Sequence, residues 1–164
     1  EAGVCFNLRL IGDGPQVEDI KSRVAAYHLE EAVHFAGWLP HPQMAEYYRK
    51  AHLMLLPSAS EGWPKVLSEG MAYGVVPLAS TISSIPQNLK AFGCGRALPQ
   101  EAVAFAAAVR VYAAHPEVWK VESLAGMAAA RHFTYEAYLE GVQSMALSTW
   151  GLQLPVKAGG NARS

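Results

Sequence analysis

The sequence has few charged residues and no excess of either sign. Charged residues make up 16% of its 164 positions, and 13 Lys and Arg against 14 Asp and Glu leave a formal net charge of −1. Without a basic surplus, there is no electrostatic basis for binding nucleic acid or an anionic membrane surface. The apolar runs also fall well short of the roughly 20 residues that a membrane-spanning helix needs. We therefore expect neither a nucleic acid partner nor a transmembrane segment.

Cysteine is scarce, and histidine lacks the spacing of a metal site. Cys5 and Cys94 are the only two cysteines and lie far apart, so we expect reduced thiols and a cytoplasmic protein. None of the six His shows the paired spacing of a zinc site, and we predict no metal and no cofactor. The first residues include no Met and lack the basic start and apolar core of a signal peptide. This indicates a processed, truncated or fragmentary product.

Apolar residues are abundant, and they lie in short segments that alternate along the chain between a strand pattern and a helix pattern. They make up 51% of the chain, which predicts one well-packed domain. Strands are expected at 7–11, 33–36, 51–57, 75–79 and 95–98, and helices around 15–27, 44–48, 65–73 and 85–92. This alternation predicts an α/β fold, a Rossmann-like doubly wound parallel sheet with helices on both faces. Pro77 is expected near a sheet edge or bulge, because proline has no N–H to donate.

From Glu101 onward the pattern is helical only. An Ala-rich helix over 101–114 is followed by a second helix that starts at Pro116, and Thr134 is expected to cap the last helix. Ser84 is likewise expected to cap the helix over 85–92. Residues 151–164 are interpreted as a flexible tail, which leaves residues 1–150 as the domain.

Four loops are expected at one edge of this sheet. In doubly wound sheets, ligands bind outside the carboxyl ends of the strands. Residues 12–14, 37–40, 58–64 and 80–84 all follow predicted strands, and we expect them to face one site. Gly12-Asp13-Gly14 lacks the third glycine of the dinucleotide motif, so a simple turn and a ligand contact are equally good interpretations of it.

Two carboxylates, Glu61 and Glu69, bracket the start of the helix expected over 65–73. A helix N-terminus offers free N–H groups and a positive dipole end, which suits phosphate. Glu69 lies roughly 6–8 Å further along the helix, where its carboxylate could accept hydrogen bonds from a ribose. Spacing alone equally allows two solvated acids. The small and apolar residues after Glu69, residues 70–72, favour a buried helix and therefore the ligand site.

The residues around this helix resemble a known signature. It consists of Pro57-Ser58, then Glu61-Gly62-Trp63, a second acid at Glu69 after seven intervening residues, then residues 71–74 and a strand that contains Pro77. This pattern closely resembles the signature of group 1 (family 4) retaining glycosyltransferases of the GT-B fold. Similarity at 10–15, 33–39, 93–95 and 133–135 extends the resemblance, in order, over roughly residues 6–146. The chain resembles the C-terminal domain of these enzymes, which binds the nucleotide-sugar.

The resemblance implies a role for each matching residue. The implied set is Glu61, Gly62, Trp63 and Pro64 for the donor sugar, Lys65 and Val66 for the diphosphate, Glu69 for the ribose, and Trp38 and Leu39 for the base. Glu61 is the implied catalytic residue, as an orienter of sugar hydroxyls rather than a nucleophile. Trp38 could equally serve ordinary packing, and Lys65 could point to solvent.

The sequence also departs from the family. Many relatives have Gly at the position of Pro64, which lacks an N–H and so removes one potential donor to the ligand. The family's Arg and Lys on the donor diphosphate would precede residue 1, as would its first strand and its N-terminal acceptor-binding domain. We therefore expect the isolated chain to be inactive.

The expected function is the donor-binding half of a retaining glycosyltransferase. The whole enzyme would move a sugar from a UDP- or GDP-linked donor to an acceptor saccharide or lipid, in polysaccharide or glycolipid synthesis. The resemblance implies a cytoplasmic enzyme and leaves open peripheral attachment to the inner face of the membrane. Two alternatives are a nucleotide-sugar epimerase on the same scaffold and a non-catalytic module that binds nucleotide-sugar.

Overall fold

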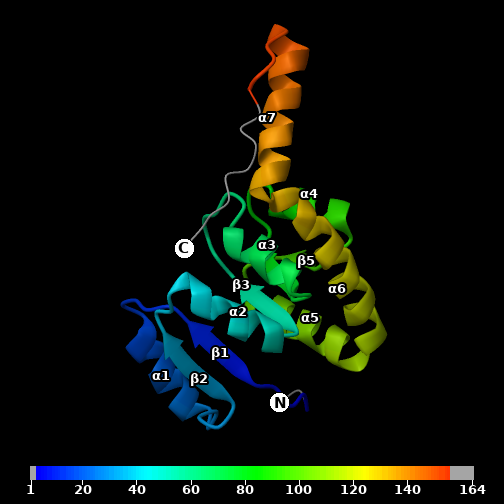
Figure 1. Ribbon diagram of the computed structural model, residues 1–164. Coiled ribbons are helices and arrows are strands. Elements are labelled where there is room, and N and C mark those ends of the chain that lie inside the picture. The colour runs from blue at the N-terminus through cyan, green and yellow to red at the C-terminus, as the bar shows by residue number, and fades with distance from the viewer. Residues whose placement is uncertain (1–2, 156–164) are drawn as a thin grey trace.

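The computed structural model describes residues 3–155. Strands and helices first alternate: β1 (Leu8–Ile11), α1 (Val17–Ala26), β2 (Val33–Gly37), α2 (His41–Lys50), β3 (Leu53–Leu56), α3 (Lys65–Ala72), β4 (Val76–Ser80), α4 (Ile85–Phe92) and β5 (Arg96–Leu98). Helices alone follow: α5 (Ala102–Ala114), α6 (Pro116–Ala130), the 3-10 helix η1 (Arg131–Phe133) and α7 (Tyr135–Trp150) (Figure 1). The predicted order of elements and the α/β class are confirmed. Residues 151–155 form no helix or strand, and the rest of the predicted tail, 156–164, lies outside the described residues.

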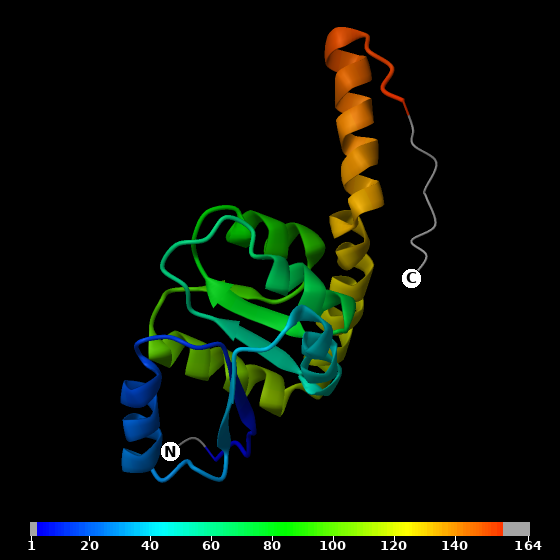
Figure 2. The same cartoon turned by 60° about the vertical axis from the view of Figure 1, so that its left-hand side comes forward.

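The strands pair in parallel, as predicted, but they form two sheets. β1 pairs with β2, and β3, β4 and β5 form a second sheet in which β4 is the central strand. The expected single sheet is therefore divided between β1 and β3, which do not pair with each other. The unit made of β1, α1 and β2 lies beside the rest of the domain (Figures 1 and 2).

The three-stranded sheet carries the core of the molecule. On one face, Val76 and Leu78 of β4 pack against α5 through Phe105, Ala108 and Tyr112. On the other face, Ala79 packs against Leu67 of α3 and against Ile85 and Leu89 of α4. Successive strand residues point to opposite faces, so β4, which is apolar except for Ser80, is buried on both sides. Helices on both faces agree with the predicted doubly wound arrangement.

Pro77 lies in the middle of this sheet, so the prediction that it sits near an edge or bulge was wrong. Val76 donates its N–H to His52 of the β3 side, whereas Thr81 donates to Leu98 of β5. Alternation along the strand therefore points the nitrogen of Pro77 toward β5, whose pairing with β4 begins only at Leu78 and Arg96. Because there is no strand to accept a hydrogen bond at that point, the missing N–H costs no ladder bond.

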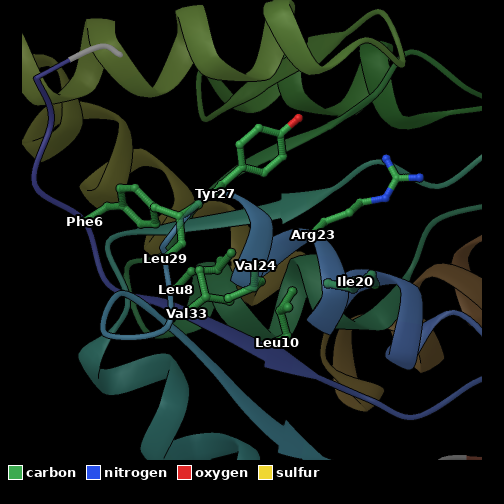
Figure 3. A pocket seen from close by; sticks show the side chains of 9 residues that line it. All are labelled: Phe6, Leu8, Leu10, Ile20, Arg23, Val24, Tyr27, Leu29 and Val33. Atoms are coloured by element: carbon green, nitrogen blue, oxygen red, sulfur yellow. The ribbon is translucent and has the colours of Figure 1, made fainter.

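The β1–α1–β2 unit is much less buried than the main sheet. None of the ten residues of α1 is buried, and of β1 and β2 only Val33 is. A hollow of about 260 Å³ lies between the helix and the two strands, and Figure 3 shows apolar side chains of both lining it. Leu8, Leu10, Val24 and Val33 are among them. This unit thus contributes little packed interior of its own.

The C-terminal helices follow the prediction with one correction. Thr134 caps α7 as expected, because its Oγ1 accepts a hydrogen bond from the N–H of Ala137 at 3.1 Å. Ser84 precedes α4 but makes no side-chain cap, since its hydroxyl donates to the carbonyl of Gly62 instead, at 3.4 Å. α7 projects away from the body, as both views show, and leaves Tyr135, Tyr138 and Trp150 exposed (Figures 1 and 2).

Candidate functional site

The loop between β3 and α3 is held in place by the loops that follow β4 and β5. Gln100 donates its side-chain amide to the carbonyl of Pro57 at 2.7 Å, and Ser84 donates to the carbonyl of Gly62. The structure therefore brings together two of the four loops expected at the carboxyl edge, 58–64 and 80–84, and adds the loop after β5. Within the loop, Glu61 and Gly62 are exposed at the surface.

Trp63 anchors the end of this loop in the body of the domain. Its ring stacks on Phe133 at a centroid distance of 4.9 Å and meets Phe92 edge-on at 6.2 Å. The indole nitrogen is buried and has no hydrogen-bond partner within the described residues. The side chain of Trp63 is thus used for packing, and only its backbone is free to face a ligand.

The first turn of α3 leaves backbone donors unused. Pro64 is the N-cap residue, with extended φ and ψ of −66° and 127°, and its carbonyl accepts the N–H of Leu67 at 3.0 Å. The N–H groups of Lys65 and Val66 have no acceptor in the part of the chain that the structure describes. Unsatisfied N–H groups together with the helix dipole make this end of α3 suitable for an anion. The side chain of Lys65 is exposed beside it.

Glu69 lies on α3, one turn beyond those donors, and α2 holds its carboxylate. His41 Nε2 lies 3.0 Å from Oε1, and the Tyr48 hydroxyl donates to Oε2 at 3.2 Å. Burial, reinforced by the Glu69 carboxylate, raises the pKa of Tyr48, so that its hydroxyl stays protonated. The side chain of Glu69 is 29% exposed, which excludes the simple alternative of a fully solvated acid.

Trp38 and Leu39 lie in the loop between β2 and α2. The side chain of Trp38 is 74% exposed, and so it does not serve the core packing that its sequence allowed. His41, two residues after Leu39, contacts Glu69, so this loop leads directly to the ribose position expected at Glu69. A flat and exposed indole can stack on a nucleobase.

A second hollow lies where β1 ends. It measures about 420 Å³ and is lined by the turn at Gly12, Asp13 and Gly14, together with Ile20 of α1 and Phe35 of β2. The N–H of Gly14 donates to the Asp13 carboxylate at 2.8 Å, which is the turn that the sequence indicated. The hollow lies at the carboxyl edge of β1, as expected for the 12–14 loop, but residues of the other three expected loops do not line it.

His41, Tyr48 and Gln100 are the site residues that the sequence did not single out. Tyr48 and His41 lie 21 and 28 residues from Glu69, so no local spacing connects them. The helix expected around 44–48 included Tyr48 but gave it no role in the site. Among the described residues, no three His, Cys, Asp or Glu side chains are placed to hold a metal ion. Within residues 3–155, no helix combines the length and apolar character needed to cross a bilayer.

Comparisons with known proteins agree on one family. Residues 4–118 match the model of the family described as glycosyl transferases group 1. WcaL of Escherichia coli (strain K12), named as a glycosyltransferase of colanic acid biosynthesis, is 34% identical over 107 residues, which cover 61% of this chain and 26% of WcaL. AmsK of Erwinia amylovora, an amylovoran biosynthesis glycosyltransferase, is 32% identical over 96 residues, 55% of this chain and 24% of AmsK.

Solved structures show the same fold. Sucrose-phosphate synthase from Thermosynechococcus elongatus matches with a TM-score of 0.75 and 26% identity, over 88% of this chain and 39% of that chain. Anabaena HepE in complex with UDP matches with a TM-score of 0.76 and 18% identity, over 87% of this chain and 41% of that chain. The chain thus spans about a quarter of the length of these curated relatives and about two fifths of the solved chains.

Proposed function

Because the chain belongs to the group 1 glycosyl transferases, we propose that it forms the part of such an enzyme that binds the nucleotide-sugar donor. Its fold is that of the GT-B glycosyltransferases. The proposed reaction moves the sugar to an acceptor saccharide or lipid with retention of configuration at the transferred carbon. The names of WcaL and AmsK, both assigned to polysaccharide synthesis, support an acceptor of that kind.

The observation that carries the proposal is the arrangement of the first turn of α3. Two free N–H groups, those of Lys65 and Val66, lie between the carboxylates of Glu61 and Glu69 along the chain. A diphosphate on the free donors would place a sugar toward one acid and a ribose toward the other. The ligand with this sequence of groups is a nucleoside-diphosphate sugar. The UDP bound to HepE supports a uridine or similar nucleotide here.

The donor sugar would lie against the exposed loop. Glu61 would accept hydrogen bonds from its hydroxyls, while the N–H groups of Gly62 and Trp63 are donors for its oxygens. Pro64 adds no donor, but its fixed φ suits the start of the helix. Beyond the ribose, the base would lie on Trp38 and Leu39.

Catalysis would depend on the leaving group, a nucleoside diphosphate whose negative charge grows as the glycosidic bond breaks. The N–H groups of Lys65 and Val66, the dipole of α3 and the Lys65 ammonium would stabilise that charge. Glu61 would orient the sugar for attack by the acceptor. This division of roles needs no protein nucleophile.

Calorimetric titration of the purified protein with UDP, GDP and their sugar conjugates tests the proposal. We expect one of the two series to bind, and we expect Glu69→Gln to weaken binding about tenfold, because it removes a charged acceptor of hydrogen bonds. The exposed acid Glu136 of α7 gives the matched control, Glu136→Gln, which should leave binding unchanged. Absence of binding by both nucleotide series would contradict the proposal.

The same preparations separate binding from turnover. We expect the 164-residue chain alone to transfer no sugar, since among residues 3–155 we propose no acceptor-binding surface and no cationic pair on the diphosphate. Product analysis by NMR, with donor present and acceptor omitted, would detect epimerised sugar if the scaffold served as an epimerase. Measurable transfer by the chain alone would overturn the assignment of a donor-binding half.

A further inference from the structure

Glu69 is the one acid of the proposed donor site whose carboxylate is hydrogen-bonded by another helix. The partners are the hydroxyl of Tyr48, 3.2 Å from Oε2, and the ring of His41, 3.0 Å from Oε1. Both come from α2, which also begins two residues after the loop proposed for the base. The carboxylate therefore has a separate protein partner for each oxygen.

The two partners differ sharply in how firmly they are held. Tyr48 is 6% exposed and stacks on Tyr73 at a centroid distance of 5.7 Å. The guanidinium of Arg49 lies over the ring of Tyr73, 5.4 Å from its centroid. Its hydroxyl remains a donor because its pKa is raised, first by burial and then by Glu69. His41, in contrast, has a side chain that is 79% exposed, and so water or a ligand can replace it at little cost.

The terminal torsion of a glutamate is otherwise broad and roughly two-fold. A hydroxyl fixed against Oε2 limits that rotation and turns the second oxygen, Oε1, toward the solvent side where His41 lies. An incoming hydroxyl can then take the place of the imidazole on Oε1. Pre-orientation of this kind lowers the entropy lost when a ligand binds.

We propose that Tyr48 is a positioning residue that orients the Glu69 carboxylate for a vicinal diol, the ribose of the nucleotide. The inference rests on the proposed function and adds to it a residue that touches no ligand. Its effect should therefore appear only with nucleotides that carry the diol.

The test measures affinity for UDP and GDP and for their 2′,3′-dideoxy forms, by calorimetry, in the wild type and in Tyr48→Phe. This substitution removes the hydroxyl but keeps the ring that stacks on Tyr73. We expect Tyr48→Phe to weaken binding of the ribonucleotide about tenfold, the effect of one hydrogen bond to a charged group, and to leave the dideoxy nucleotide unchanged. Tyr47→Phe is the matched control, because the hydroxyl of this neighbour on α2 has no partner within the described residues.

A second comparison uses the carboxylate itself. Glu69→Gln should remove most of the preference for the diol, and adding Tyr48→Phe to it should change nothing further, because the two residues act as one unit. Thermal melting followed by circular dichroism establishes that each variant is folded. If Tyr48→Phe unfolds at too low a temperature for titration, the test uses Glu69→Asp instead and compares its affinity for the ribonucleotide with its affinity for the dideoxy nucleotide. Its shorter carboxylate cannot meet Tyr48 in the same place, so a retained preference would overturn the inference.

The outcomes separate the two levels of the proposal. If the wild type binds neither UDP nor GDP, the proposed function fails. If it binds them but does not prefer the diol, the ribose role of Glu69 fails and the role of Tyr48 with it. If it prefers the diol and Tyr48→Phe weakens both forms equally, or neither, then the inference alone is overturned.

Discussion

Gly95 shows how a single residue decides the start of a strand. It precedes β5 and has a φ of +76°, which favours glycine, and a Cβ here would collide with the carbonyl oxygen of Pro77 and lie 2.7 Å from its ring. The absence of a side chain is therefore what lets β5 begin against the buried proline of β4.

We predict that Gly95→Ala lowers the free energy of unfolding by about 3 kcal/mol or more, from the left-handed backbone and the collision together. Gly93→Ala is the control, because Gly93 has a similar φ of +60° but open space around it, and it should cost only about 1–2 kcal/mol. Urea unfolding of both variants measures the difference. Equal losses would show that the contact with Pro77 does not matter.

At the site, some residues could be predicted from the sequence and others could not. Glu61 and Glu69 were singled out because they flank a helix start and match the family signature, and their roles stay predictions. Tyr48 and His41 could not be singled out, since their contacts with Glu69 depend on how α2 packs against α3 and not on local spacing. The stacking of Trp63 on Phe133 has the same origin, a contact between residues 70 positions apart.

At the scale of elements, the two sheets differ in how much they bury. Every residue of β4 is buried, whereas β1 and β2 have only Val33 and pack with a helix that buries no residue. Local stability follows the number of buried apolar contacts, so the β1–α1–β2 unit should open more readily than the β3–β4–β5 sheet.

We predict that backbone amides of β1 and β2 exchange with deuterium faster than those of β4, with native-state exchange read by mass spectrometry or NMR. Val33→Ala should speed exchange in β1 and β2 while leaving β4 unchanged, because Val33 is the one buried side chain of these two strands. Equal protection of the two sheets would contradict this view of the fold.

The elements themselves were predictable because their signals are local. Short, mostly apolar runs and helical spacing located the strands and helices from β1 to α4, and 95–98 was expected as a fifth, short strand. The wrong predictions depend on neighbouring elements. Pro77 is tolerated in a central strand because β4 pairs with β5 only from the next residue, Leu78. Ser84 donates a hydrogen bond to Gly62 across the site instead of capping α4. The division into two sheets is likewise a matter of pairing, which strand sequences do not specify.

At the scale of the whole molecule, three buried groups resist losing their protons. Burial raises the pKa of the Cys94 thiol to about 12, with Glu122 adding to the effect. Burial also raises the pKa of Tyr48 and of Tyr112, whose hydroxyl donates to Glu122 at 2.6 Å. In the unfolded chain, these groups would ionise near their ordinary values of 9 and 10.

We therefore predict that stability falls as the pH rises above about 9. Between that pH and the raised values in the folded state, the unfolded chain releases protons that the folded chain retains, and each group contributes up to about 1.4 kcal/mol per pH unit. Urea unfolding from pH 8 to pH 11 measures the slope, and Tyr112→Phe should reduce it by one group's share. A constant free energy of unfolding over this range would refute the prediction.

The projection of α7 determines how the molecule behaves as a particle in solution. Its 16 residues extend about 24 Å at about 1.5 Å per residue. The radius of gyration of a compact domain of this size is only about 15 Å. A molecule with such a projecting helix tumbles anisotropically and has a larger hydrodynamic radius than a sphere of equal mass. In gel filtration, the apparent mass read from the elution volume is therefore too high and suggests too many chains per particle. The oligomeric state has to be established by methods that measure mass directly.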